Sequence, residues 1–213
     1  MALVVTVANL KGGTGKSTVA LALATTLHGA GHRVLIVDAD SQGTCRQWAA
    51  RAAEAAHEGP PVVSVDTRAI ARDLPRLSES YEVVIIDTPA RLGPAARAAM
   101  VAADLVVLPV SPGAADVWAL QETLEVLEEA KALRPELRAS VVLNRADRTT
   151  LARLASEALS ELGVRLLGAQ LGNRVAHGEA MLGGLGVVEY APNTKAADEV
   201  DRLTREILKE LEG

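Results

Sequence analysis

Residues 9–18 read Asn-Leu-Lys-Gly-Gly-Thr-Gly-Lys-Ser-Thr, and they follow directly on an apolar run at Leu3–Ala8. A helical pattern at Thr18–His28 comes next, so the segment is predicted as strand, glycine-rich turn and helix. The three glycines let the backbone turn tightly and point its N–H groups at an anion. This composition, in this order of elements, is typical of a phosphate-binding loop.

The loop predicts how the phosphates of a nucleotide and Mg²⁺ would be held. The side chain of Lys16 is placed to reach the β- and γ-phosphates, and the hydroxyl of Ser17 is placed to bind Mg²⁺. The positive end of the helix dipole adds to the attraction for phosphate. The residues predicted to contact the phosphates are Gly12, Gly13, Thr14, Gly15, Lys16, Ser17 and Thr18.

The loop departs from the strict G-x-x-x-x-G-K-[ST] pattern at two neighbouring positions. Leu10 stands where the first glycine is expected, and a second lysine, Lys11, precedes the two glycines. A lone lysine beside glycines is commonly a solvated loop residue. The full string K-G-G-T-G-K-S-T, however, resembles the deviant Walker A motif of the ParA/MinD family of ATPases. The resemblance implies a catalytic role in which Lys11 reaches across an ATP-sandwich homodimer to the phosphates bound by the partner subunit.

Strand and helix patterns alternate along the whole chain. Apolar, β-branched runs predict strands at Leu3–Ala8, Arg33–Asp38, Val62–Val65, Val83–Asp87, Leu105–Val110, Ala139–Asn144 and Val164–Leu167. Helical patterns lie between them, for instance at Trp118–Leu133 and Leu151–Leu162. Continuous apolar runs are typical of parallel strands buried on both faces. We therefore expect one α/β domain over residues 1–213, doubly wound, with a mostly parallel sheet and helices on both faces.

Carboxylates follow two of the predicted strands. Asp38 and Asp40 end the second strand and Asp87 ends the fourth, and ligands of an open parallel sheet bind at the carboxyl ends of its strands. Turn formation or helix capping is the ordinary alternative for each. The family resemblance implies that Asp38 and Asp87, the latter in a Walker B-like segment, support Mg²⁺, and that Asp40 positions or activates the attacking water. Ser41 replaces the family's usual proline, which leaves the rigidity of this loop open.

The resemblance also implies a site for the adenine base. Asn144 ends the predicted strand Ala139–Asn144, where the family places an asparagine against adenine. The segment Pro192, Asn193 and Thr194 is similar to the second adenine-side loop of the family. Ordinary polar turns are the alternative for both segments.

Composition limits the classes of protein that this chain can represent. A net charge of −5 excludes a protein that coats DNA through overall positive charge, but it does not exclude a local basic patch. The one cysteine, Cys45, rules out an intramolecular disulfide and a Cys-x-x-Cys metal site, and it fits a reducing compartment. No run of about 18 apolar residues is present. We therefore expect a cytoplasmic protein without a membrane partner.

Missing residues argue against several branches of the family that the chain resembles. The nitrogenase iron-protein and iron–sulfur carrier branches need more than one cysteine. The segment 201–213 carries four acids and three bases, unlike the basic membrane helix of the MinD branch. Biosynthetic ATP-dependent ligases of the same fold generally lack a lysine at the position of Lys11. A MinD-like membrane-cycling regulator and such a ligase stay open as alternatives.

The remaining resemblance is to short ParA-type positioning ATPases. In that class the ATP-bound dimer binds duplex DNA without sequence preference, and a ParB-like or cargo-adaptor protein stimulates hydrolysis, which implies association with the nucleoid. Residues 134–175 carry seven arginines and four acids, a net basic stretch that suits phosphate contact, although scattered surface arginines would give the same count. DNA contacts are predicted at Arg174, Arg145 and Arg148. The cargo, whether a plasmid, a chromosome locus or a large protein assembly, stays open.

Overall fold

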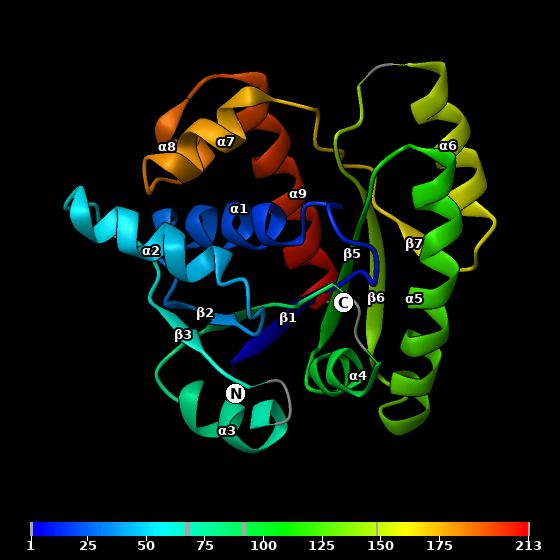
Figure 1. Ribbon diagram of the computed structural model, residues 1–213, viewed down its shortest axis with the longest axis horizontal. Helices are drawn as coiled ribbons and strands as arrows, with labels where there is room; N and C mark the ends of the chain where they lie inside the picture. The colour runs from blue at the N-terminus through cyan, green and yellow to red at the C-terminus, as the bar shows by residue number, and fades with distance from the viewer. Residues whose placement is uncertain (1, 67–68, 91–92, 148, 213) are drawn as a thin grey trace.

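A single sheet of seven parallel strands forms the centre of the computed structural model, which describes residues 2–66, 69–90, 93–147 and 149–212 (Figure 1). The strands are β1 (Leu3–Val7), β2 (Val34–Asp38), β3 (Val62–Ser64), β4 (Val83–Asp87), β5 (Leu105–Val110), β6 (Arg138–Leu143) and β7 (Arg165–Leu166). Their order across the sheet is β3-β2-β4-β1-β5-β6-β7. All seven strands expected from the apolar runs are confirmed, with ends that differ by no more than one residue.

Helices connect the strands and close the chain. They are α1 (Lys16–Gly29), α2 (Thr44–Glu54), α3 (Ile70–Leu77), α4 (Gly93–Val101), α5 (Ala114–Leu133), α6 (Thr150–Ser160), α7 (Val175–Leu182), α8 (Val187–Tyr190) and α9 (Lys195–Glu212). The helix expected at 118–133 begins four residues earlier than its apolar pattern indicated. No helix within the described ranges has the length and apolarity needed to cross a membrane.

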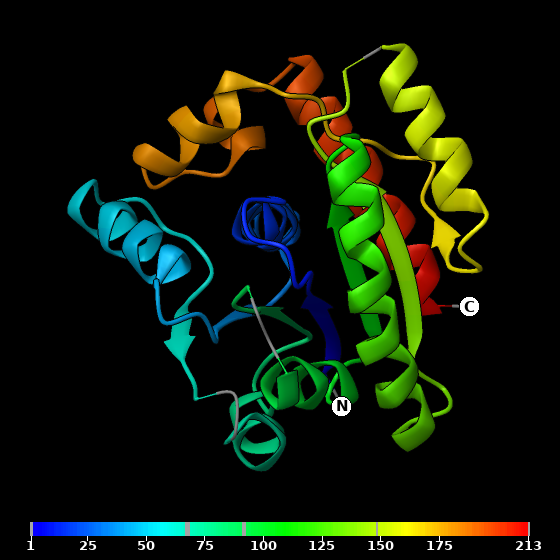
Figure 2. The ribbon, with the colours of Figure 1, turned by 45° about the vertical axis from the view of Figure 1, so that its right-hand side comes forward.

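Helices cover both faces of the sheet (Figures 1 and 2). Successive strand residues point to opposite faces. Val4 and Val84 belong to a core cluster that includes residues of α3, α4, α5 and α6. Val5 and Ile85 belong to a second cluster that includes residues of α1, α2, α7, α8 and α9. Strands buried on both faces explain why the sequence shows continuous apolar runs rather than alternation. The predicted doubly wound α/β fold is confirmed.

The strand order sets where a ligand can bind. The chain runs from β1 to β2 on one side of the sheet and later returns past β1 to β5 on the other side, so the order reverses beside β1. Parallel sheets bind ligands outside the carboxyl ends of the strands at such a reversal. The loop after β1 lies at this reversal. The neighbouring strand β4 pairs with β2, and their register places Asp87 directly opposite Asp38.

Helix α2 is tied at its side to the loop between α7 and α8. The indole Nε1 of Trp48 donates to the carbonyl of Leu185 at 3.1 Å. Gly184 has a φ of 71°, and a Cβ placed on it would lie 2.3 Å from the backbone nitrogen of Ala52. Only glycine allows this close approach, so α2 and residues 184–185 are packed backbone to backbone.

Candidate nucleotide-binding site

The loop between β1 and α1 has the backbone of a phosphate-binding loop. Gly13 and Gly15 have φ values of 81° and 89°, and Gly15 caps the start of α1. The amide of Asn144 donates to the carbonyl of Thr14 at 2.7 Å, and a Cβ on Gly15 would lie 2.1 Å from that amide nitrogen. Glycine at position 15 is therefore required twice, by its dihedral and by the packing of Asn144.

Lys16 opens α1, and its side chain turns back over the loop. Its side chain is buried, and its Nζ donates to the carbonyl of Lys11 at 3.2 Å. Burial lowers the pKa of Lys16, while the negative charges of Asp87 and Asp40 oppose that shift. The ammonium group thus lies beside the loop backbone and within the field of the two carboxylates, where a polyphosphate would give it a further anionic partner.

Lys11 is an ion-paired residue rather than a solvated one. Its Nζ lies 3.0 Å from Oδ1 of Asp116, in the first turn of α5, and both side chains are partly exposed. Its backbone N–H donates to Oδ1 of Asn9 at 2.9 Å. The backbone N–H of Leu10 donates in turn to the hydroxyl of Thr123, on the same helix. The first half of the loop is therefore docked on α5.

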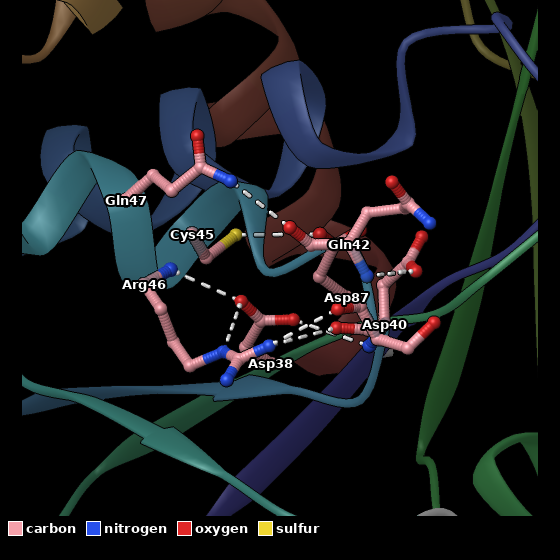
Figure 3. A network of polar contacts seen from close by, with 8 residues as sticks. Asp38, Asp40, Gln42, Cys45, Arg46, Gln47 and Asp87 are labelled. Atoms are coloured by element: carbon pink, nitrogen blue, oxygen red, sulfur yellow. Dashed lines mark hydrogen bonds and ion pairs between the residues drawn. The ribbon is translucent and has the colours of Figure 1, made fainter.

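Two fully buried carboxylates lie side by side at the ends of β2 and β4 (Figure 3). Asp38 accepts the backbone N–H of Asp40 at 3.1 Å on Oδ1 and that of Arg46 at 3.0 Å on Oδ2. The guanidinium Nε of Arg46 lies 3.5 Å from the same Oδ2. Asp87 accepts the thiol of Cys45 at 3.3 Å on its Oδ2. Asp38 and Asp87 are therefore held by consecutive residues at the start of α2.

The Asp87 carboxyl has an unusual environment for an ionised group. Burial raises its pKa to about 6, although the hydroxyl of Ser17 and the thiol of Cys45 oppose the shift. The nearby charges of Asp38 and Asp40 raise it further. Its Oδ1 is buried and accepts no hydrogen bond from the described residues. A bound cation, or water bound to one, would satisfy this oxygen and stabilise the charged form.

The residues present fit Mg²⁺ held together with a nucleotide. In the described part of the chain no group of three or more His, Cys, Asp or Glu side chains is arranged to hold a metal by itself. Magnesium in nucleotide sites keeps several waters and is bound by one or two carboxylates plus substrate phosphates. Ser17 together with the buried pair Asp38 and Asp87 provides such a set.

The loop that carries Asp40 is ordered without the proline of the family pattern. Oδ1 of Asp40 accepts the backbone N–H of Gln42 at 2.9 Å, a local turn that needs no proline. The guanidinium of Arg46 donates to the carbonyls of Asp40 and Ser41 at 3.5 and 3.4 Å (Figure 3). The amide of Gln47 reaches the Gln42 carbonyl at 3.0 Å. Side chains from α2 therefore hold this loop where Ser41 stands.

The segments predicted to bind adenine have structural partners of their own. Asn144 follows β6 and, as described, its amide bonds to the phosphate loop. Asn193 has a φ of 61°, and Thr194 accepts the N–H of Ala197 at the start of α9. Pro192 lies in the same loop between α8 and α9. The contact of Asn144 and of 192–194 with a base stays a prediction.

The arginines predicted to contact DNA differ in their availability. Arg174 donates to Oε1 of Glu199 at 2.8 Å, and its side chain is 35% exposed. Arg145 is exposed and has a φ of 56°. Arg148 lies outside the described residues. Other arginines of the basic stretch are also ion-paired: Arg134 with Asp104, Arg153 with Glu157 and Arg165 with Glu210. Much of the positive charge counted in the sequence is therefore neutralised locally.

Three contacts of the site were not predicted from the sequence. These are the thiol of Cys45 on Asp87, the guanidinium of Arg46 on Asp38, and the carboxylate of Asp116 on Lys11. The position of Cys45 and Arg46 directly after a carboxylate-bearing loop is the one sequence signal that could have indicated two of them.

Solved structures share this fold. The septum site-determining protein MinD from Pyrococcus horikoshii, complexed with Mg-ADP, has a TM-score of 0.77 and 23% identity over 97% of this chain and 96% of that chain. Cobyrinic acid a,c-diamide synthase from Mycobacterium smegmatis, with bound ADP and magnesium, has a TM-score of 0.80 and 19% identity over 100% of this chain and 96% of that chain. Nucleotide and Mg²⁺, the cofactors expected from the sequence, are the ligands that these structures contain.

Sequence comparison is more selective than the shared fold. The maintenance of carboxysome distribution protein A of Gloeobacter kilaueensis is 37% identical, over 98% of this chain and 94% of that protein, and its counterpart in Halothiobacillus neapolitanus is 32% identical over 95% and 94%. The chromosome-partitioning ATPase Soj of Thermus thermophilus is 31% identical over 96% and 94%. Residues 5–187 match the family model described as the CobQ/CobB/MinD/ParA nucleotide binding domain. With relatives of this similarity along nearly its whole length, the chain belongs to the ParA-like positioning and partitioning branch of that family.

Proposed function

We propose that this protein is a ParA-like ATPase that hydrolyses ATP to ADP and phosphate and uses the cycle to position or partition a cargo. The observation that carries the proposal is the glycine loop with two lysines, Lys11 and Lys16, beside the buried pair Asp38 and Asp87. A phosphate-binding loop beside two carboxylates meets the needs of phosphoryl transfer, because catalysis of this reaction depends on positioning of the phosphates and stabilisation of their charge.

Each residue of the site has a distinct proposed role. The N–H groups of residues 12–18 and the ammonium of Lys16 bind and orient the phosphates. Ser17, Asp38 and Asp87 hold Mg²⁺, which when bound neutralises charge on the phosphoryl oxygens. Asp40 lies on the loop held by Arg46 and orients the attacking water. Asn144 and residues 192–194 bind the base.

Dimerisation links this chemistry to a mechanical cycle. In the proposed ATP-bound homodimer, Lys11 leaves Asp116 and contacts the phosphates of the partner subunit, where it stabilises charge in the way an arginine finger does. Hydrolysis removes the γ-phosphate and with it the contact that holds the subunits together. The ATP state is then the assembled state, and the ADP state is the monomer.

The proposed partners are double-stranded DNA and an adaptor protein. The ATP dimer binds duplex DNA without sequence preference and is thereby associated with the nucleoid, and a ParB-like or cargo-adaptor protein stimulates hydrolysis and release. The relatives named for carboxysome distribution and chromosome partitioning support a positioning role. Among cargoes, a large protein assembly agrees with the two carboxysome-distribution relatives, and a chromosome locus agrees with the third.

The decisive test compares wild-type protein with Lys16→Ala and Lys209→Ala. Lys16→Ala removes the principal side-chain cation for the phosphates and should abolish tight ATP binding in calorimetry, while Lys209→Ala, at an exposed position in the last turn of α9, should retain it. Vesicle pelleting and duplex DNA binding, each with ATP, distinguish a membrane cycle from a nucleoid cycle. ATP binding that survives Lys16→Ala would mean that this loop is not the nucleotide site.

A further inference from the structure

The first turn of α2 contacts both buried carboxylates of the site. Arg46 donates its backbone N–H to Oδ2 of Asp38 at 3.0 Å, and Cys45 donates its thiol to Oδ2 of Asp87 at 3.3 Å (Figure 3). The side chains of Cys45, Asp38 and Asp87 all have 0% exposure. Two adjacent residues of one helix turn therefore reach two carboxylates that lie on neighbouring strands.

The two oxygens of the Asp87 carboxylate have different contacts. Its Oδ2 accepts the Cys45 thiol, whereas its Oδ1 is buried and accepts no hydrogen bond from the described residues. The Ser17 hydroxyl also lies near the carboxylate and favours its charged form. Without a partner on Oδ2 the carboxylate could rotate about its Cβ–Cγ bond, because this terminal torsion is broad. A donor on Oδ2 fixes which oxygen is left free and where that oxygen points.

We propose that Cys45 is a positioning residue for the magnesium site: its thiol holds Oδ2 of Asp87 so that Oδ1 is presented to the hydrated Mg²⁺. This inference rests on the proposed function, since it assumes that Asp87 supports Mg²⁺ in a nucleotide complex. Carboxylates that serve metal ions are themselves commonly hydrogen-bonded, and removal of such an outer partner lowers metal affinity or activity.

A cysteine suits this buried position better than the usual polar donors. It packs as a small apolar side chain between α2 and the sheet, in the same buried cluster as Trp48 and Ile85. Its S–H is nevertheless a donor, though a weak one. The residue thus combines core packing with one directed hydrogen bond to a carboxylate.

The experiment uses Cys45→Ala and Cys45→Ser in the full chain. Both variants remove the sulfur and leave a similar space, but serine keeps an O–H donor and alanine does not. ADP binding is measured by calorimetry across a Mg²⁺ titration and again in EDTA, and thermal unfolding of the ligand-free variants gives their stability. The Mg²⁺ concentration for half-maximal stabilisation of ADP binding is the quantity compared.

We expect the alanine variant to need roughly 10-fold more Mg²⁺, the lower end for losing an outer-shell partner, and the serine variant to remain within about 3-fold of wild type. ADP affinity in EDTA should be unchanged in both. Equal Mg²⁺ requirements in the alanine variant and wild type, or equal losses in the two variants, would overturn the positioning role. Wild-type protein that binds ADP with no Mg²⁺ dependence would instead remove the magnesium site on which the inference rests.

Discussion

The ammonium of Lys11 lies 3.0 Å from the carboxylate of Asp116 in the same chain, and this ion pair holds the lysine on α5. The two side chains are 33% and 22% exposed, and partly solvated pairs of this kind contribute up to about 1 kcal/mol. If Lys11 acts across a dimer, this pair must break first. Asp116 would then set part of the free-energy cost of assembly.

Replacement of Asp116 by asparagine should favour the ATP-bound dimer. Loss of up to about 1 kcal/mol in each of the two subunits, about 2 kcal/mol per dimer, corresponds to a dissociation constant lowered by up to about 30-fold. Sedimentation with ATP at low ionic strength measures the change, and salt should reduce it, because the pair is partly exposed. Lys11→Ala is the matched variant and should weaken the dimer. A dimer unaffected by either change would remove the cross-subunit role of Lys11.

Asp40→Ala should separate nucleotide binding from hydrolysis. Asp40 lies on the loop rather than in the buried pair, so ATP and Mg²⁺ binding should persist while turnover falls by about 10²-fold or more, the scale of losing a general base or a water-orienting group. Single-turnover hydrolysis and ATP calorimetry provide the two measurements. Gln42→Ala, two residues on, is the control for disturbance of the loop. Wild-type turnover in Asp40→Ala would assign the water to another group.

Asp87→Asn should stabilise the ligand-free protein while removing the magnesium site. The folded-state pKa of about 6 lies above the reference value of 3.8, so the native state binds this proton more tightly than the unfolded chain. Wild-type unfolding free energy should therefore fall as pH rises through the interval between these values and stay reduced above it. The shift of about two units corresponds to about 3 kcal/mol.

Denaturant unfolding of wild type and Asp87→Asn at pH 5 and pH 7.5, without nucleotide, tests the predicted direction of this pH dependence. The advantage of the asparagine variant should be larger at pH 7.5 than at pH 5, and with ADP present in both samples, added Mg²⁺ should give further stabilisation only in the wild type. An advantage of the same size at both pH values would show that the ionisation of Asp87 is not its source.

DNA binding should respond in opposite directions to the two partners of one ion pair. Arg174→Gln should weaken binding of duplex DNA by the ATP form and reduce the salt slope by about one, because one phosphate contact is lost. Glu199→Gln should strengthen binding, since it leaves the Arg174 charge uncompensated while an amide oxygen can still accept the N–H of Gly172. Anisotropy titrations at two salt concentrations measure both.

Arg33→Gln is the control for this pair of variants. Arg33 precedes β2, at the amino ends of the strands, and its charge is paired with Glu82. DNA affinity should not change on its replacement. Binding that is independent of nucleotide, or that is indifferent to both Arg174→Gln and Glu199→Gln, would assign the DNA contact to another surface or remove it.

The fold was largely predictable because its strands are buried on both faces. Each strand therefore appears as an uninterrupted apolar run, and the position of Asp38 and Asp87 at strand ends followed from the same runs. Helix α5 was less predictable. Its apolar pattern begins near Trp118, whereas the helix begins at Ala114, so Asp116 lay outside the predicted element and its contact with Lys11 could not be anticipated.

Charge was harder to predict than secondary structure. The count of arginines in residues 134–175 treats each as free, but several of them pair with acids that are distant along the chain. Arg165 meets Glu210 and Arg174 meets Glu199, both on α9. The thiol of Cys45 on Asp87 is likewise a contact between elements that one strand and one helix separate along the chain, and only the folded chain reveals it.

The hydrogen bond from Trp48 to Leu185 lets α2 connect the carboxylates at the strand ends with the loop between α7 and α8. The start of this helix is hydrogen-bonded to Asp87 and Asp38 through Cys45 and Arg46. Its side packs closely against residues 184–185, next to α8. A packed helix moves as a rigid body more readily than it bends. A shift of the loops that carry Asp38 and Asp87 during a nucleotide cycle would therefore be transmitted through α2 to the surface around α7 and α8. A protein bound at that surface could respond to which nucleotide occupies the site.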